Sequence, residues 1–84
     1  MVIFVATKEG YKELESIIRT GKYPVWVGAG VLSDNELNEI REVGVYLTNF
    51  SYPIDLGNSE VIEEALESIS LHHPNERVWV ECVP

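Results

Sequence analysis

Apolar residues fall into two kinds of segment along the chain, and their spacing predicts four strands and three helices. Short runs rich in valine and aromatic side chains are typical of buried strands. The predicted strands are residues 2–6, 24–27, 45–50 and 77–83. Apolar side chains that recur every three or four residues indicate a helix with one buried face. The predicted helices are residues 8–20, 34–43 and 60–71.

Capping residues mark the ends of the predicted helices. Thr7 precedes the first helix, where its hydroxyl can accept a hydrogen bond from a backbone N–H group. Ser33 and Glu36 have the spacing of a capping box at the start of the second helix. Gly21 and Gly44 follow the first two helices at the position where a left-handed residue is expected. These signals support the helix boundaries independently of the apolar pattern.

The order βαβαβαβ predicts a small α/β domain of three layers, with a mostly parallel four-stranded sheet. The strand orders 2-1-3-4 and 3-2-1-4 both fit, and an antiparallel last strand is an alternative. Either order leaves two helices on one face of the sheet and one helix on the other. We expect the sparsely covered face to expose apolar surface and to form a homodimer. Trp26 or Trp79 would anchor that interface if its side chain lies on this face.

Length and composition agree with one globular domain over residues 1–84. The chain has 45% hydrophobic and 24% charged residues, which separates it from disordered sequences. Its apolar runs are about as long as a strand, so no transmembrane segment is expected. The first residues lack the basic region of a signal peptide, and Cys82 has no second cysteine with which to form a disulfide. A cytoplasmic location is the simplest expectation.

The net charge of −8 is concentrated in the second part of the chain. Phosphate binding requires clustered lysine and arginine, so nucleic acid is not an expected partner, and neither is an anionic membrane. The helix over residues 60–71 carries four carboxylates on one side, without lysine partners. This candidate interaction face consists of Glu60, Glu63, Glu64 and Glu67. It is typical of a solvated helix surface, and it could also dock a basic protein partner.

Polar and glycine residues follow the predicted strands at their carboxyl ends, where open α/β sheets bind ligands. The candidate ligand-binding residues are Thr7, Lys8, Gly28, Ala29, Gly30, Ser33, Thr48, Asn49 and Asp55. Gly28 and Gly30 form a strand–turn–helix junction of the kind that can hold a phosphate. However, position 33 is serine where the dinucleotide fingerprint has glycine or alanine, and the glycines also suit a simple tight turn. No cofactor is therefore expected.

Other polar residues have structural interpretations that we prefer. Asp34 and Asp55 could approach each other across the sheet end, but a third metal ligand is missing. His72 and His73 are adjacent at a helix end, where cations are favoured and where two side chains point in different directions. Cys82 fits a buried structural thiol. No metal site and no catalytic residue is predicted.

The sequence therefore favours a non-catalytic, homodimeric binding or interaction module. One alternative is a site for a phosphorylated metabolite or nucleotide at the carboxyl ends of the strands. Another is an acidic inhibitor or immunity-type protein that docks on a basic surface. The first interpretation requires an exposed apolar surface, the second requires free donors at a helix start, and the third requires an exposed acidic helix.

Overall fold

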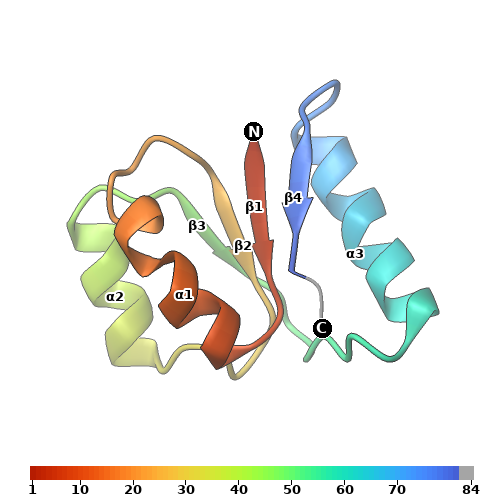
Figure 1. The fold of residues 1–84 in the computed structure, drawn as a ribbon, viewed down its shortest axis with the longest axis horizontal. Helices are drawn as coiled ribbons and strands as arrows, with labels where there is room; N and C mark the ends of the chain where they lie inside the picture. Colours follow the sequence, from red (N-terminus) through yellow and green to blue (C-terminus); the bar gives the residue numbers. More distant parts are fainter. Residues whose placement is uncertain (82–84) are drawn as a thin grey trace.

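The chain forms one four-stranded sheet with helices on both faces (Figure 1). The computed structural model describes residues 1–81. The strands are β1 (Val2–Val5), β2 (Val25–Val27), β3 (Leu47–Asn49) and β4 (Val78–Val80). The helices are α1 (Lys8–Ile18), α2 (Asp34–Glu42) and α3 (Ser59–His72). Element types and order agree with the pattern of apolar positions.

The sheet has the order β3-β2-β1-β4, and all three strand pairs are parallel. This is the predicted order 3-2-1-4, so the alternative order 2-1-3-4 and the antiparallel last strand are wrong. The register places Ile3 beside both Val25 and Trp79, so these three side chains share one face. Strands β2 and β3 lie on one side of β1, whereas β4 lies on the other side. The order of the strands therefore reverses at the boundary between β1 and β4.

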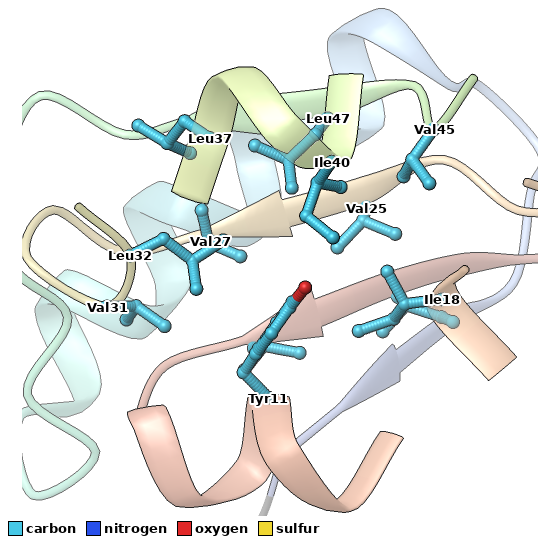
Figure 2. Packing of buried hydrophobic residues seen from close by; sticks show 12 residues of the cluster. Tyr11, Ile18, Val25, Val27, Val31, Leu32, Leu37, Ile40, Val45 and Leu47 are labelled. Atoms are coloured by element: carbon cyan, nitrogen blue, oxygen red, sulfur yellow. The ribbon is translucent and has the colours of Figure 1, made fainter. Parts of the chain in front are cut away.

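The larger part of the core lies between the sheet and helices α1 and α2 (Figure 2). Tyr11 and Ile18 from α1 and Leu37 and Ile40 from α2 are all buried against the strands. Apolar spacing along each helix gives it one face of this kind. The hydroxyl of Tyr11 has no hydrogen-bond partner among residues 1–81, and burial raises the pKa of this tyrosine above 10.0.

Helix α3 covers the other face together with the segment that leads to it. Ala65 and Ile69 pack on Val2 and Phe4, while Phe50 and Ile54 from the segment before α3 cover the rest. The buried side chain of Trp26 lies in this layer, with its ring 5.2 Å from that of Phe50. The ring of Phe50 forms tilted pairs with those of Phe4, Trp26 and Tyr52. Aromatic side chains therefore cover this face of the sheet together with α3.

The face with one helix is consequently better covered than we expected. Trp26 is only 5% exposed there, because Phe50 and Ile54 fill the space that a second helix would occupy. The expectation that this face leaves apolar sheet surface uncovered is wrong. Trp79 instead lies on the face with two helices and is 40% exposed, because β4 lies at the sheet edge beyond α1.

Most helix ends agree with their capping signals, whereas all four strands are shorter than expected, β3 and β4 the most. Thr7, Ser33 and Asn58 are the N-cap residues, and Gly21 and Gly44 have positive φ angles of 71° and 95°. Strand β3 begins two residues later than expected, after Val45 and Tyr46. Strand β4 ends at Val80, and Cys82 lies outside the described residues, so the interpretation of its thiol stays a prediction.

Candidate functional site

The carboxyl ends of the strands form the rim at which we expected a ligand site. The order of the strands reverses between β1 and β4. Open α/β sheets bind their ligands at such a boundary, outside the carboxyl ends of the strands. Thr7 follows β1 there, at the start of α1, and Glu81 follows β4. Both residues therefore lie at the most favourable position in this topology.

The carboxylate of Glu81 binds to the N-cap residue of α1, Thr7, and to the residue before it. One of its oxygens accepts hydrogen bonds from the backbone N–H groups of Ala6 (2.8 Å) and Thr7 (2.9 Å). The other oxygen accepts a hydrogen bond from the hydroxyl of Thr7, which in turn accepts one from the N–H of Gly10 at 3.1 Å. Helix N-termini attract anions because their N–H groups are unpaired and their dipole end is positive. Here the chain supplies that anion itself.

Gly10 makes room for this carboxylate. It lies within α1 and is buried, and a Cβ atom at this position would overlap the carboxylate of Glu81. Glycine inside a helix costs about 1 kcal/mol relative to alanine, so a packing reason is expected where it occurs. The reason at Gly10 is the close approach of the Glu81 carboxylate to the first turn of α1.

The glycine turn after β2 is held by backbone contacts. The N–H of Gly28 donates to Val5, and the N–H of Ala29 donates to Tyr52 at 3.1 Å. A Cβ atom on Gly28 would approach the side chain of Ile54 to 3.0 Å. Gly30 is exposed and has a φ angle of 84°, which glycine adopts without strain. These glycines therefore have structural reasons that require no ligand.

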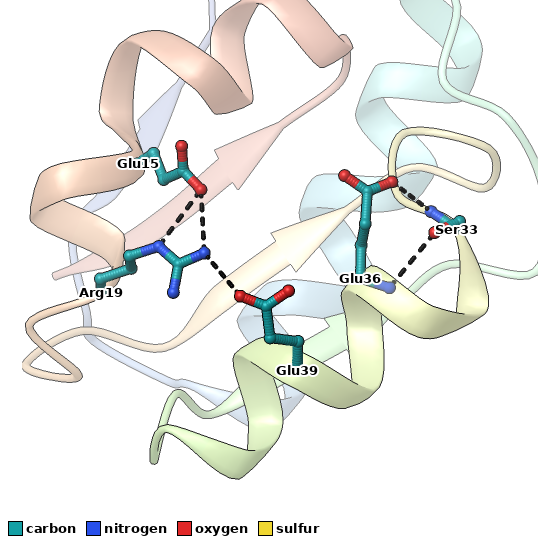
Figure 3. A network of polar contacts seen from close by, with 5 residues as sticks. All are labelled: Glu15, Arg19, Ser33, Glu36 and Glu39. Carbon is teal, nitrogen blue, oxygen red and sulfur yellow. Dashed lines mark hydrogen bonds and ion pairs between the residues drawn. The ribbon is translucent and has the colours of Figure 1, made fainter.

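The start of α2 is closed by the predicted capping box (Figure 3). The N–H of Ser33 donates to Glu36 at 3.0 Å, and the N–H of Glu36 donates to the hydroxyl of Ser33 at 3.2 Å. The bond from the Ser33 N–H holds the pKa of Glu36 below 4.5. Lys8, the cation among the rim candidates, lies 3.9 Å from the same carboxylate. Its charge therefore faces an internal anion.

Thr48 and Asn49 lie apart from Thr7 and Glu81, and Asp55 makes a local turn contact. Thr48 and Asn49 lie on the edge strand β3, two strand spacings from β1, or about 10 Å. Asp55 accepts a hydrogen bond from the N–H of Gly57 at 2.8 Å, which is a local turn contact. Thr7 and Glu81 are thus hydrogen-bonded to each other. Ser33 and Lys8 both contact Glu36. That the nine candidates bind a ligand stays a prediction.

An apolar groove lies on the face with two helices, between α1 and β4. It has a volume of about 90 Å³ and is lined by Met1, Ile3, Leu14, Ile17 and Trp79. Met1, Ile17 and Trp79 are 43%, 44% and 40% exposed, respectively. Large apolar side chains that share one exposed groove often mark a binding surface. We call this surface the α1–β4 groove.

Charged side chains elsewhere are arranged as surface networks. Arg19 bridges the two helices of this face by binding Glu15 and Glu39, each at 3.1 Å (Figure 3). The hydrogen bond to Glu39 raises the pKa of Arg19 most, and the hydrogen bond to Glu15 raises it further. The four glutamates of the acidic face of α3 are all exposed. Among residues 1–81 they have no ion pair, so solvation is sufficient to account for them.

The paired histidines lie near the amino-terminal ends of the strands. The His72 ring lies 5.4 Å from that of Trp26, and His73 contacts Glu76 at 2.9 Å through Nδ1. No three histidine, cysteine or acidic side chains within residues 1–81 are placed to hold a metal ion. No helix in this part of the chain has the length and hydropathy needed to cross a membrane.

Sequence reasoning missed Gly10, Ile17, Met1 and Glu81. The sequence did contain a signal for the first, because glycine in a helix interior suggests a close approach. Glu81 is 74 positions from Thr7, so no local pattern connects them. Met1 and Ile17 become notable only when β4 is placed beside β1, because the groove forms between elements distant in sequence.

Comparisons with known proteins identify no relative. No family model matches the chain, and no match is found among curated proteins or solved structures. The functional interpretation therefore depends on the geometry of the molecule itself.

Proposed function

We propose that the protein is a non-catalytic interaction module that forms a homodimer through the α1–β4 groove. The observation that supports this proposal is the exposure of Met1, Ile17 and Trp79 around a single groove. Covering apolar surface is favourable in proportion to the area removed from water. A chain of 84 residues has a small core, so burial against a partner also adds to its stability.

The chemistry of the groove favours a protein surface as its occupant. Ile3 and Leu14 form an apolar floor, and Trp79 lies at the edge of the groove. Tryptophan is enriched among the residues that contribute most to binding at protein interfaces. The groove, at about 90 Å³, is small compared with the pockets of several hundred cubic ångströms that enclose small molecules. We expect a reversible interface, with a dissociation constant on the order of 10 µM, which corresponds to about −7 kcal/mol.

The strand-end rim gives less support to a metabolite site. Glu81 occupies the start of α1, and the capping box of Ser33 and Glu36 occupies the start of α2. Asn58 accepts hydrogen bonds from the first turn of α3. A ligand anion would have to displace one of these internal partners before it could use the same donors. The groove requires no such displacement.

Sedimentation equilibrium tests the proposed homodimer. The wild-type protein should change from monomer to dimer as its concentration rises from about 1 to about 300 µM, because this range spans the expected dissociation constant. Trp79→Lys should remain monomeric, since it places a charge in the apolar centre of the groove. Tyr46→Lys is the matched control, because Tyr46 is 67% exposed and precedes the strand at the opposite sheet edge.

Two outcomes would contradict the proposal. One is a wild-type protein that stays monomeric throughout the concentration range. The other is a dimer that Trp79→Lys leaves intact. Circular dichroism of each variant shows whether the fold is retained, and the partial exposure of both substituted side chains predicts that it is.

A further inference from the structure

We infer that the two copies dock about a two-fold axis, with Glu13 of each copy paired with Arg77 of the other across the α1–β4 groove. This arrangement rests on the homodimer proposed above and specifies its orientation. Symmetric dimers use the same surface twice, so each contact between different residues occurs in two copies. A groove with an anion at one corner and a cation at the opposite corner is complementary to itself.

Arg77 supplies the cation at the β4 side. It immediately precedes β4, and its backbone oxygen accepts a hydrogen bond from Val2. Side chains alternate along a strand, so Arg77 lies on the same face as Trp79, whereas Val78 packs in the α3 layer. Arg77 is exposed, and its guanidinium has no ion pair or hydrogen bond to another residue of the described chain.

Glu13 supplies the anion at the α1 side. It lies four residues before Ile17, and positions four apart share one side of a helix. Ile17 lines the groove together with Trp79 of β4, and Gly10, on the same side of α1, meets the carboxylate of Glu81, so this side faces β4. Glu13 is exposed, and within residues 1–81 its carboxylate has no ion pair and no hydrogen bond. Glu15 differs, because it is already bound to Arg19.

The two charges lie at opposite corners of the groove. Helix α1 begins at the rim with Lys8, and Glu13 lies five residues further on, or about 8 Å along the helix axis. Arg77 lies four residues before Glu81, or about 13 Å from the rim along the strand. A two-fold axis that crosses the groove obliquely exchanges these corners. It also brings the apolar centre of one copy, including Trp79, against that of the other.

The overall negative charge does not oppose this orientation strongly. The acidic face of α3 lies on the opposite side of the sheet from the groove, so the dimer does not place these glutamates in its interface. Exposed charges separated by more than about 8 Å are largely screened at physiological salt. The electrostatics of docking are therefore set mainly by the charges beside the groove.

Charge reversal tests this pairing. Glu13→Arg places two cations at each contact, and Arg77→Glu places two anions there, so each homodimer should weaken at least about tenfold at low salt. A mixture of the two variants should form heterodimers of nearly wild-type affinity. In such a heterodimer one contact joins Arg77 to Glu13, and the other joins the two substituted side chains with their charges exchanged.

Matched controls separate this pairing from a change in net charge. Glu63→Arg and Lys22→Glu alter exposed residues away from the groove by the same charge differences, and their dimers should resemble that of the wild type. If both reversals behave like these controls while the wild type dimerises, the pairing is wrong and the homodimer stands. If both reversals weaken the dimer and the mixture does not recover, the two-fold exchange is wrong. A monomeric wild type overturns both proposals.

Discussion

Gly10→Ala should destabilise the protein, although the same substitution stabilises most helices. Alanine favours a helix interior by about 1 kcal/mol relative to glycine. The new Cβ atom, however, would displace the carboxylate of Glu81, which accepts hydrogen bonds from Ala6 and Thr7. Three charge-assisted bonds in a partly buried site contribute about 3 kcal/mol together, after allowance for solvent. The net loss is about 2 kcal/mol, or about 10 °C in melting temperature.

The sign of the effect should reverse when Glu81 is absent. In the Glu81→Ala background no carboxylate remains to be displaced, so Gly10→Ala should stabilise by about 1 kcal/mol. Urea denaturation of the four proteins in this double-mutant cycle measures both values. Ser16→Ala, on the exposed side of α1, should have the same effect in both backgrounds. A stabilising Gly10→Ala in the wild type, or an equal effect in both backgrounds, would refute the proposed steric role of Glu81.

Two further predictions concern titratable residues of the fold. Tyr11→Phe should stabilise by about 1 kcal/mol in urea denaturation, because the buried hydroxyl has no hydrogen-bond partner within residues 1–81, whereas Tyr23→Phe should change little. Because burial raises the pKa of Tyr11, wild-type stability should fall as pH rises above 10.0, and Tyr11→Phe should reduce this fall. The lowered pKa of Glu36 stabilises the fold above pH 4.5, and this contribution is lost as pH falls through the folded-state pKa. Melting temperatures between pH 3 and 6 should therefore decline less steeply for Glu36→Gln than for the wild type or Glu42→Gln.

The elements of this fold are predictable because their signals are local. Thr7, Ser33 and Glu36 mark helix starts through contacts that span three residues. Gly21 and Gly44 mark helix ends because each adopts a positive φ angle. The same local signals leave two strand orders open, since both orders use identical strands and helices. Selecting between them requires contacts between β1 and β4 that no short pattern encodes.

The surface that we propose for dimerisation was harder to predict. Counting helices indicated that the one-helix face would be exposed, but Phe50 and Ile54 cover that face from a segment without regular structure. Conversely, α1 and α2 do not cover the edge strand β4 on their own face of the sheet. Trp79 therefore stays partly exposed beside Ile17. Coverage depends on where each segment crosses the sheet. The apolar pattern identifies buried residues better than it identifies which face remains open.

The central claim is that the chain self-associates through the α1–β4 groove, and its two tryptophans allow a direct test. A dilution series followed by ¹H–¹⁵N NMR reports the indole N–H resonances of both side chains. Trp79 lies in the groove and its resonance should shift as the concentration rises, whereas the resonance of Trp26, buried in the α3 layer, should stay constant. Resonances that do not change with concentration, or a shift of Trp26 without one of Trp79, would contradict the claim.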